Sequence, residues 1–98
     1  MRGLGFAASG FGSPDFLVAL VWEKARPAFG FASNLFRYDD FYNLIYRFAY
    51  GDRQSPFGWE IDHIRPVALG GSDMLSNLRP LHCRQNASLG GLLSGLLG

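Results

Sequence analysis

The stretch from Gly58 to Asn86 constrains the fold more than any other part of the chain, because its few polar side chains lie at fixed separations between apolar runs. Asp62 and His63 lie near the end of an apolar-aromatic run. Asn77 follows His63 by fourteen positions, and Asn86 follows Asn77 by nine. Neighbours on a β-strand point to opposite faces. One of the two can therefore hold a metal ion while the other approaches from elsewhere.

Asn86 is predicted to lie on a helix, because residues 82–89 (HCRQNASL) are compatible with helical structure and would place it on the second turn. A helix folded back on a hairpin brings the amide oxygen of Asn86 beside the carboxylate of Asp62. Two such oxygens, with the remaining positions open to water and phosphate, suit Mg²⁺ or Mn²⁺. The spacing thus predicts a site for a hard divalent cation.

The N-terminal half predicts one helix. In FLVALVWEKAR (residues 16–26) the apolar residues Phe16, Leu17, Leu20 and Val21 recur at helical spacing after Asp15. Proline removes a backbone donor and clashes with the preceding turn, so Pro27 is expected to end this helix.

Two apolar-aromatic runs, residues 41–50 and 57–64, flank a polar turn and favour a β-hairpin with each other. Pro66 ends the second run, and GGSD at residues 70–73 predicts a loop. Residues 77–81 then resume an extended piece before the predicted helix.

Composition indicates one folded domain. Of the 98 residues, 48% are hydrophobic and only 17% charged, which excludes a disordered charged tail. A net charge of +1 is not that of a strongly basic nucleic-acid binder, so contacts to nucleic acid must come from local arrangement. Cys83 is the only cysteine; this excludes an intrachain disulfide and fits a reducing, cytoplasmic location.

The pattern W-E-I-D-H-I-x-P-V…G-G-S-D-x-L-S-N-L-x-P-L-H, residues 59–82, resembles the HNH endonucleases, closely the small single-domain bacterial and phage-type members. YGDRQSPFG before it, and VWEKARP and FRYD further upstream, are also similar to that subgroup. The resemblance covers about residues 21–89. It implies an α+β domain with a ββα-metal core, in which a hairpin and a helix clasp one divalent ion, and an extra N-terminal helix or hairpin.

The resemblance also implies roles for four residues. Asp62 and Asn86 would be the metal ligands, and His63 would be the general base. Asn77, in the loop between the two strands, would orient His63 by hydrogen-bonding to its backbone. The implied activity is hydrolysis of DNA phosphodiester bonds with Mg²⁺ or Mn²⁺ as cofactor.

An alternative function is a catalytically weak or inactive HNH-like domain that acts as a DNA- or protein-interaction module. Many family members carry Arg or Lys after the final Asn, where this chain has Ala87, Ser88 and Leu89. Two arginines that flank the motif, Arg65 and Arg84, are predicted to contact phosphates instead.

Other residues in the motif have structural interpretations. Glu60 shares a strand face with Asp62 and is expected to pair with an arginine. His82 is expected to cap or pack the helix, although its i, i+4 spacing from Asn86 leaves a substitute ligand role open. Trp59, Ile61 and Cys83 are expected in the core.

The predicted organisation is a flexible leader (residues 1–14), a nuclease domain (15–89, with its motif core at 50–89) and a Leu/Gly-rich tail (90–98). The tail carries an apolar helical stripe that should pack on the domain's aromatic surface or on a second copy of the chain, giving a homo-oligomer; its members are Leu89, Leu92, Leu93, Leu96 and Leu97. The apolar runs fall short of the roughly 18 residues of a membrane span.

Overall fold

The computed structural model describes residues 13–97, and for residues 92–97 it describes the backbone alone. Within residues 13–97 the chain forms two α-helices, two short 3₁₀ turns and five strands in two small sheets, which makes it an α+β domain. In chain order the elements are α1 (Asp15–Trp22), β1 (Arg26–Pro27), β2 (Phe36–Tyr38), β3 (Leu44–Tyr46), β4 (Trp59–His63), η1 (Val67–Leu69), η2 (Leu75–Asn77), β5 (Leu78–His82) and α2 (Cys83–Leu97).

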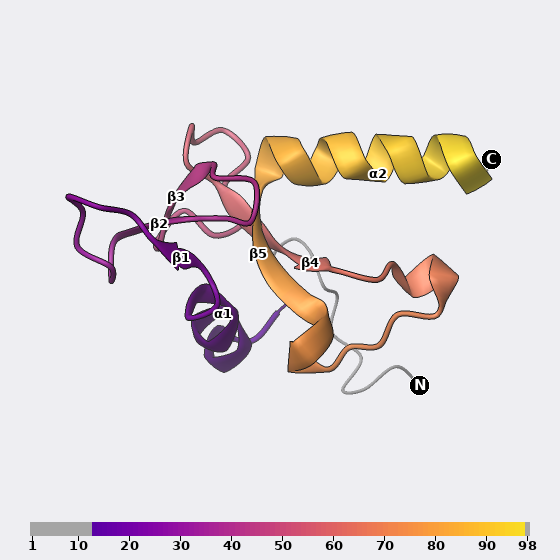
Figure 1. Cartoon of the computed structure of the whole chain (residues 1–98), viewed down its shortest axis with the longest axis horizontal. Helices are drawn as coiled ribbons and strands as arrows, with labels where there is room; N and C mark the ends of the chain where they lie inside the picture. The colour runs from indigo at the N-terminus through magenta and orange to yellow at the C-terminus, as the bar shows by residue number, and fades with distance from the viewer. Residues whose placement is uncertain (1–12, 98) are drawn as a thin grey trace.

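The second sheet is an antiparallel hairpin of β4 and β5, followed directly by α2 (Figure 1). Its register pairs Trp59 with His82, Asp62 with Arg79, and His63 with Leu78. Because side chains alternate along a strand, β4 turns Trp59 and Ile61 to one face and Glu60 and Asp62 to the other. Strand β4 therefore has one apolar face and one acidic face.

The first sheet has the order β1-β2-β3 and corrects one expectation. The predicted hairpin between residues 41–50 and 57–64 is wrong: β3 pairs with β2, and β4 pairs with β5. The cause is a turn at Asp39, whose Oδ1 accepts hydrogen bonds from the backbone N–H groups of Phe41 (2.9 Å) and Asn43 (2.8 Å). This turn folds β3 back on β2. The two predicted runs are joined by an isolated bridge between Tyr50 and Trp59 and by backbone hydrogen bonds from Tyr46 to Phe57 and from Trp59 to Ala49, and they do not form a hairpin.

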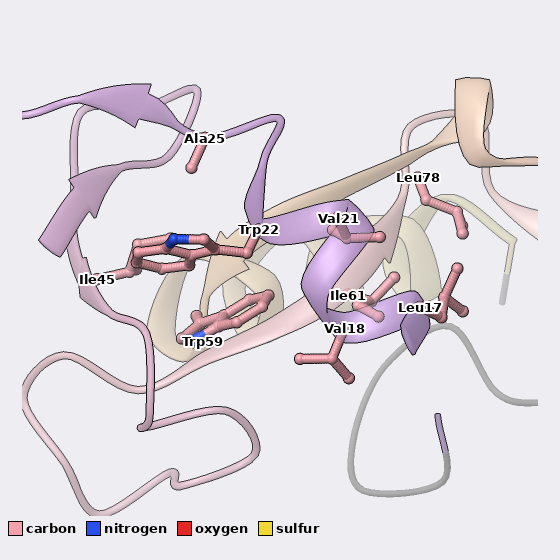
Figure 2. Packing of buried hydrophobic residues seen from close by; sticks show 9 residues of the cluster. All are labelled: Leu17, Val18, Val21, Trp22, Ala25, Ile45, Trp59, Ile61 and Leu78. Atoms are coloured by element: carbon pink, nitrogen blue, oxygen red, sulfur yellow. The ribbon is translucent and has the colours of Figure 1, made fainter. Parts of the chain in front are cut away.

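Helix α1 packs on the apolar face of the β4–β5 hairpin. Figure 2 shows the cluster, in which α1 contributes Leu17, Val18, Val21 and Trp22. These side chains meet Ile45 of β3 and Trp59, Ile61 and Leu78 of the hairpin. The rings of Trp22 and Trp59 lie 5.3 Å apart, centroid to centroid. The core is therefore built around a tryptophan pair between helix and strand.

The predicted N-terminal helix is confirmed, but its buried face and its end differ from the prediction. Phe16 and Leu20 are 58% and 47% exposed, whereas Val18 and Trp22 are buried. The buried stripe is thus shifted by one position along the helix, toward the side that meets the hairpin. The helix ends at Trp22, and Pro27 lies in β1 instead of ending it.

Helix α2 continues through Gly90, Gly91 and Gly95 to Leu97. The side chains of Leu92, Leu93, Leu96 and Leu97 lie outside those the structure describes, so packing of the tail and a homo-oligomer stay predictions, as does the leader at residues 1–12. In the part of the chain that is described, no helix is long and apolar enough to span a bilayer.

Candidate functional site

Helix α2 meets the acidic face of β4 through a hydrogen bond between Asn86 and Glu60. The Nδ2 atom of Asn86 donates to Oε1 of Glu60 at 2.8 Å. Since Glu60 and Asp62 are two residues apart on one strand, they share a face. This bond therefore places Asn86 on the same side of the hairpin as Asp62, although the two are far apart in sequence.

Glu60 is fully buried and paired with an arginine, as expected from the sequence. Arg53 donates from Nε to Oε2 (2.6 Å) and from Nη2 to Oε1 (3.0 Å). This bidentate ion pair offsets the desolvation free energy of the buried Glu60 carboxylate. Because the amide of Asn86 points its nitrogen at Glu60, the atom it can offer to a cation is Oδ1.

Asp62 is partly buried and bonded across the hairpin. The Nε atom of Arg79 donates to its Oδ2 at 2.9 Å, and the Asp62 side chain is 18% exposed. Burial raises the pKa of Asp62, and the hydrogen bond and charge of Arg79 oppose that rise. A cation bound to Asp62 would therefore meet a carboxylate that already has one positively charged neighbour.

The donor chemistry of this face fits a hard divalent cation. Asp62 and Asn86 offer one carboxylate and one amide oxygen, and Mg²⁺ is commonly held by one or two protein carboxylates with water and substrate phosphate completing its shell. Among the described residues no cluster of three or more His, Cys, Asp or Glu could hold a metal. A sparse oxygen site of this kind is compatible with the residues present.

His63 lies at the end of β4, where the alternation of the strand turns it away from Asp62. Its Nε2 atom is 2.7 Å from Oδ1 of Asp73, and both side chains are only 9% exposed. In the sequence, Asp73 is part of the GGSD loop signal, and that signal alone does not predict its contact with His63. Its place in the GGSD turn, ten residues after His63, was the signal available.

Asn77 closes the loop between β4 and β5. Its Oδ1 accepts from the Arg65 N–H (2.9 Å), and its Nδ2 donates to the carbonyls of Arg65 (3.1 Å) and Ser72 (2.7 Å). The expected bond from this side chain to the backbone of His63 is replaced by bonds to Arg65, two residues further on. The reason is the register, which pairs His63 with Leu78 and leaves Asn77 opposite the chain beyond the strand end.

The Asn77→Ala substitution is expected to lower the free energy of unfolding by about 1–3 kcal/mol, because it leaves the polar backbone groups of this loop without their partners. Thermal denaturation followed by circular dichroism measures the change. Asn34→Ala, in an exposed turn between β1 and β2, is the matched control and should melt like the wild type. Equal melting curves for Asn77→Ala and the wild type would contradict the role of Asn77 in closing the loop.

His82 caps α2, as expected. Its Nδ1 accepts from the N–H of Arg84 at 3.1 Å, which leaves Nε2 to donate to the carbonyl of Pro56 at 2.8 Å. Both ring nitrogens are used, so His82 has no lone pair to offer a metal. Cys83 beside it is buried, and desolvation raises the pKa of its thiol to about 11. Neither residue belongs to the candidate site.

The two flanking arginines differ in how they are held. Arg65 donates from Nε to the carbonyl of Leu69 at 2.8 Å, within the loop that Asn77 closes. Arg84 is exposed in the first turn of α2. Their contact with phosphates remains a prediction.

Comparison with known proteins identifies the segment that contains this site. The family model described as HNH endonuclease matches residues 52–89. These residues comprise the loop before β4, the β4–β5 hairpin with its long connection, and the first turns of α2. The chain matches no curated protein and no solved structure. Over residues 52–89, this chain is therefore similar to the HNH endonuclease family.

Proposed function

We propose that the protein is a metal-dependent endonuclease that hydrolyses phosphodiester bonds in DNA. One observation carries this proposal: the hydrogen bond between Asn86 of α2 and Glu60 of β4 joins the helix to the strand face that also carries Asp62. The strand, the helix and the family match together supply two oxygen ligands and, one residue after Asp62, a histidine able to act as a base.

Asp62 and Asn86 would hold Mg²⁺ or Mn²⁺. When bound, such an ion stabilises negative charge on the phosphate and on the departing oxygen. Asp62 supplies the formal negative charge of the pair, and Asn86 supplies a neutral oxygen. Glu60 accepts a hydrogen bond from Nδ2 of Asn86, which leaves the amide oxygen as the atom that could bind the ion. Oxygen ligands of this kind favour Mg²⁺ or Mn²⁺ over zinc.

His63 would take a proton from the attacking water. Histidine is suited to this role because its unperturbed pKa lies near physiological pH. General-base assistance typically contributes 10²–10⁴-fold to a rate. The side chain of His63 is held by Asp73 at 2.7 Å, so it does not have to be ordered when the substrate binds.

A second function, an HNH-like module that binds DNA or protein without cutting, is favoured by a separate observation. Ala87 and Ser88 are exposed on α2, where many family members present basic side chains to the phosphate backbone. Arg79 also bonds one oxygen of Asp62, and a metal would have to bind beside it. Cleavage and binding assays on one preparation separate the two functions.

Supercoiled plasmid, incubated with the full chain and Mg²⁺, Mn²⁺ or EDTA, tests the proposed function. We expect nicked or linear product with either metal and none with EDTA. Retained DNA binding without cleavage in either metal would support the non-cutting module. Cleavage that persists in EDTA would contradict the metal-dependent mechanism.

Asp62→Ala is expected to abolish cleavage and to weaken Mn²⁺ binding. Substitution of a residue that hydrogen-bonds to a metal ligand typically lowers metal affinity 10–100-fold. Loss of a direct ligand should therefore lower the affinity for Mn²⁺ by at least roughly 100-fold. Titration with Mn²⁺, followed calorimetrically, measures the affinity. Asp15→Ala, an exposed carboxylate in the first turn of α1, is the control and should bind and cut like the wild type. Unchanged Mn²⁺ affinity in Asp62→Ala would remove Asp62 from the ligand set.

A further inference from the structure

The contact between His63 and Asp73 joins the candidate base to a loop that the ligand set does not use. Nε2 of His63 and Oδ1 of Asp73 are 2.7 Å apart. Each side chain is 9% exposed, so the hydrogen bond between them is largely shielded from bulk water. At low exposure a charge-assisted hydrogen bond is shorter and stronger than at a surface. This geometry can therefore fix the orientation of the imidazole ring.

A carboxylate has only lone pairs to offer, so the hydrogen in this bond belongs to Nε2 of His63. In a neutral imidazole with its hydrogen on Nε2, the proton-accepting lone pair is on Nδ1. We propose that Asp73 is a positioning residue, which holds His63 as the Nε2–H tautomer with Nδ1 as the atom that accepts the proton from water. This inference rests on the proposed nuclease function and names the basic atom.

The backbone next to Asp73 is held firmly enough for this role. The carbonyl oxygen of Ser72 accepts a hydrogen bond from Nδ2 of Asn77 at 2.7 Å, and Oγ of Ser72 accepts one from the N–H of Met74 at 3.3 Å. The N–H of Gly71 donates to the carbonyl of Pro66 at 2.9 Å. Residues on both sides of Asp73 are thus tied to other parts of the loop.

Gly71 shows how closely the two sides of this loop approach. A Cβ atom at Gly71 would lie 1.7 Å from the carbonyl oxygen of Arg65, a distance that no side chain could tolerate. Glycine therefore allows the chain that leads to Asp73 to return against the chain that follows His63. The loop brings the carboxylate back to the ring across ten residues of sequence.

The first test is a ¹⁵N NMR measurement of the His63 tautomer in the metal-free protein, at a pH where the imidazole is neutral. We expect the wild type to show hydrogen on Nε2. In Asp73→Asn, the side-chain amide can donate to Nε2 instead, and the Nδ1–H tautomer should become populated. His63→Gln identifies the signals of this residue, because the chain has only two histidines.

The second test is steady-state cleavage by the same variant. An Asp→Asn change that leaves the wrong tautomer costs about 10⁴-fold in the serine-protease triad, and we expect a fall in kcat of roughly 10²-fold or more here. KM for DNA and the affinity for Mn²⁺ should stay within about twofold of wild type. Asp15→Asn, which changes an exposed carboxylate in the first turn of α1, should retain full activity.

A wild-type protein with hydrogen on Nδ1 would overturn the proposal, as would Asp73→Asn with an unchanged tautomer or unchanged kcat. The tautomer measurement needs neither metal nor substrate, so it stands apart from the nuclease activity. A wild type that never cuts DNA but shows the Asp73-dependent tautomer would contradict the proposed function alone. If Asp73→Asn fails to fold, as melting curves would show, the wild-type tautomer still decides.

Discussion

His63→Ala is expected to reduce the rate of DNA cleavage by roughly 10²–10⁴-fold, the usual contribution of a general base, while the affinity for Mn²⁺ stays close to that of the wild type. The reason is that Asp62 and His63, at the end of β4, are proposed to have separate roles as metal ligand and general base. Asp62 faces α2 and Asn86, whereas the alternation of the strand turns His63 to the other side, where it meets Asp73. Plasmid cleavage under single-turnover conditions and calorimetric titration with Mn²⁺ measure the two quantities.

Comparison with Asp62→Ala makes this prediction specific. Asp62→Ala should lose metal affinity and rate together, whereas His63→Ala should lose rate alone. If His63→Ala weakened Mn²⁺ binding as much as Asp62→Ala, the roles of ligand and base would have to be reassigned. Cleavage at the wild-type rate by His63→Ala would contradict the mechanism itself.

The sequence predicts an element of the fold well where the local pattern of residues determines that element. The helix near residues 15–22 and the turn at GGSD were recognisable from apolar spacing and glycine. The first hairpin was assigned to the wrong partner because two aromatic runs carry no information about which strands pair. Asp39 decides that point by accepting hydrogen bonds from the backbone N–H groups of Phe41 and Asn43, and two aspartates before an aromatic pair are a weak turn signal.

The buried face of α1 shows a second limit. Every residue from Phe16 to Trp22 is apolar, so periodicity cannot select one stripe over its neighbour. The partner surface selects it: Trp59 is fully buried and packs against Trp22. Burial of a large ring contributes more than burial of Leu20, and the helix turns accordingly.

Four candidate site residues, Asp62, His63, Asn77 and Asn86, are predicted from their separations and from the resemblance to one family. Their partners were not, because each partner depends on strand register or loop closure. Arg79 meets Asp62 because the register of β5 places it directly opposite. Asp73 meets His63 because Asn77 and Gly71 close the intervening loop. The motif therefore indicates the candidate reacting groups, whereas the groups that hold them in place are identified only in the folded chain.

Strand β4, which carries the candidate site, is held in place by the packing of its apolar face. Trp59→Ala is therefore expected to lower the free energy of unfolding by about 3–5 kcal/mol, the usual cost of deleting a large core aromatic. Trp59 is fully buried between the rings of Trp22 (5.3 Å) and Tyr50 (5.0 Å). In a domain of this size such a loss corresponds to a fall of about 12 °C or more in Tm.

Thermal unfolding followed by circular dichroism tests this expectation, with Phe29→Ala as the control, because Phe29 is fully exposed and its removal should leave Tm nearly unchanged. Glu60 and Asp62 lie on the same strand as Trp59, so Mn²⁺ affinity in Trp59→Ala should fall in proportion to the unfolded fraction as temperature rises. Trp59→Ala with a wild-type Tm would show that the tryptophan pair does not hold β4 in place. The acidic face would then have to be fixed from the other side, by the bonds of Glu60 to Arg53 and Asn86.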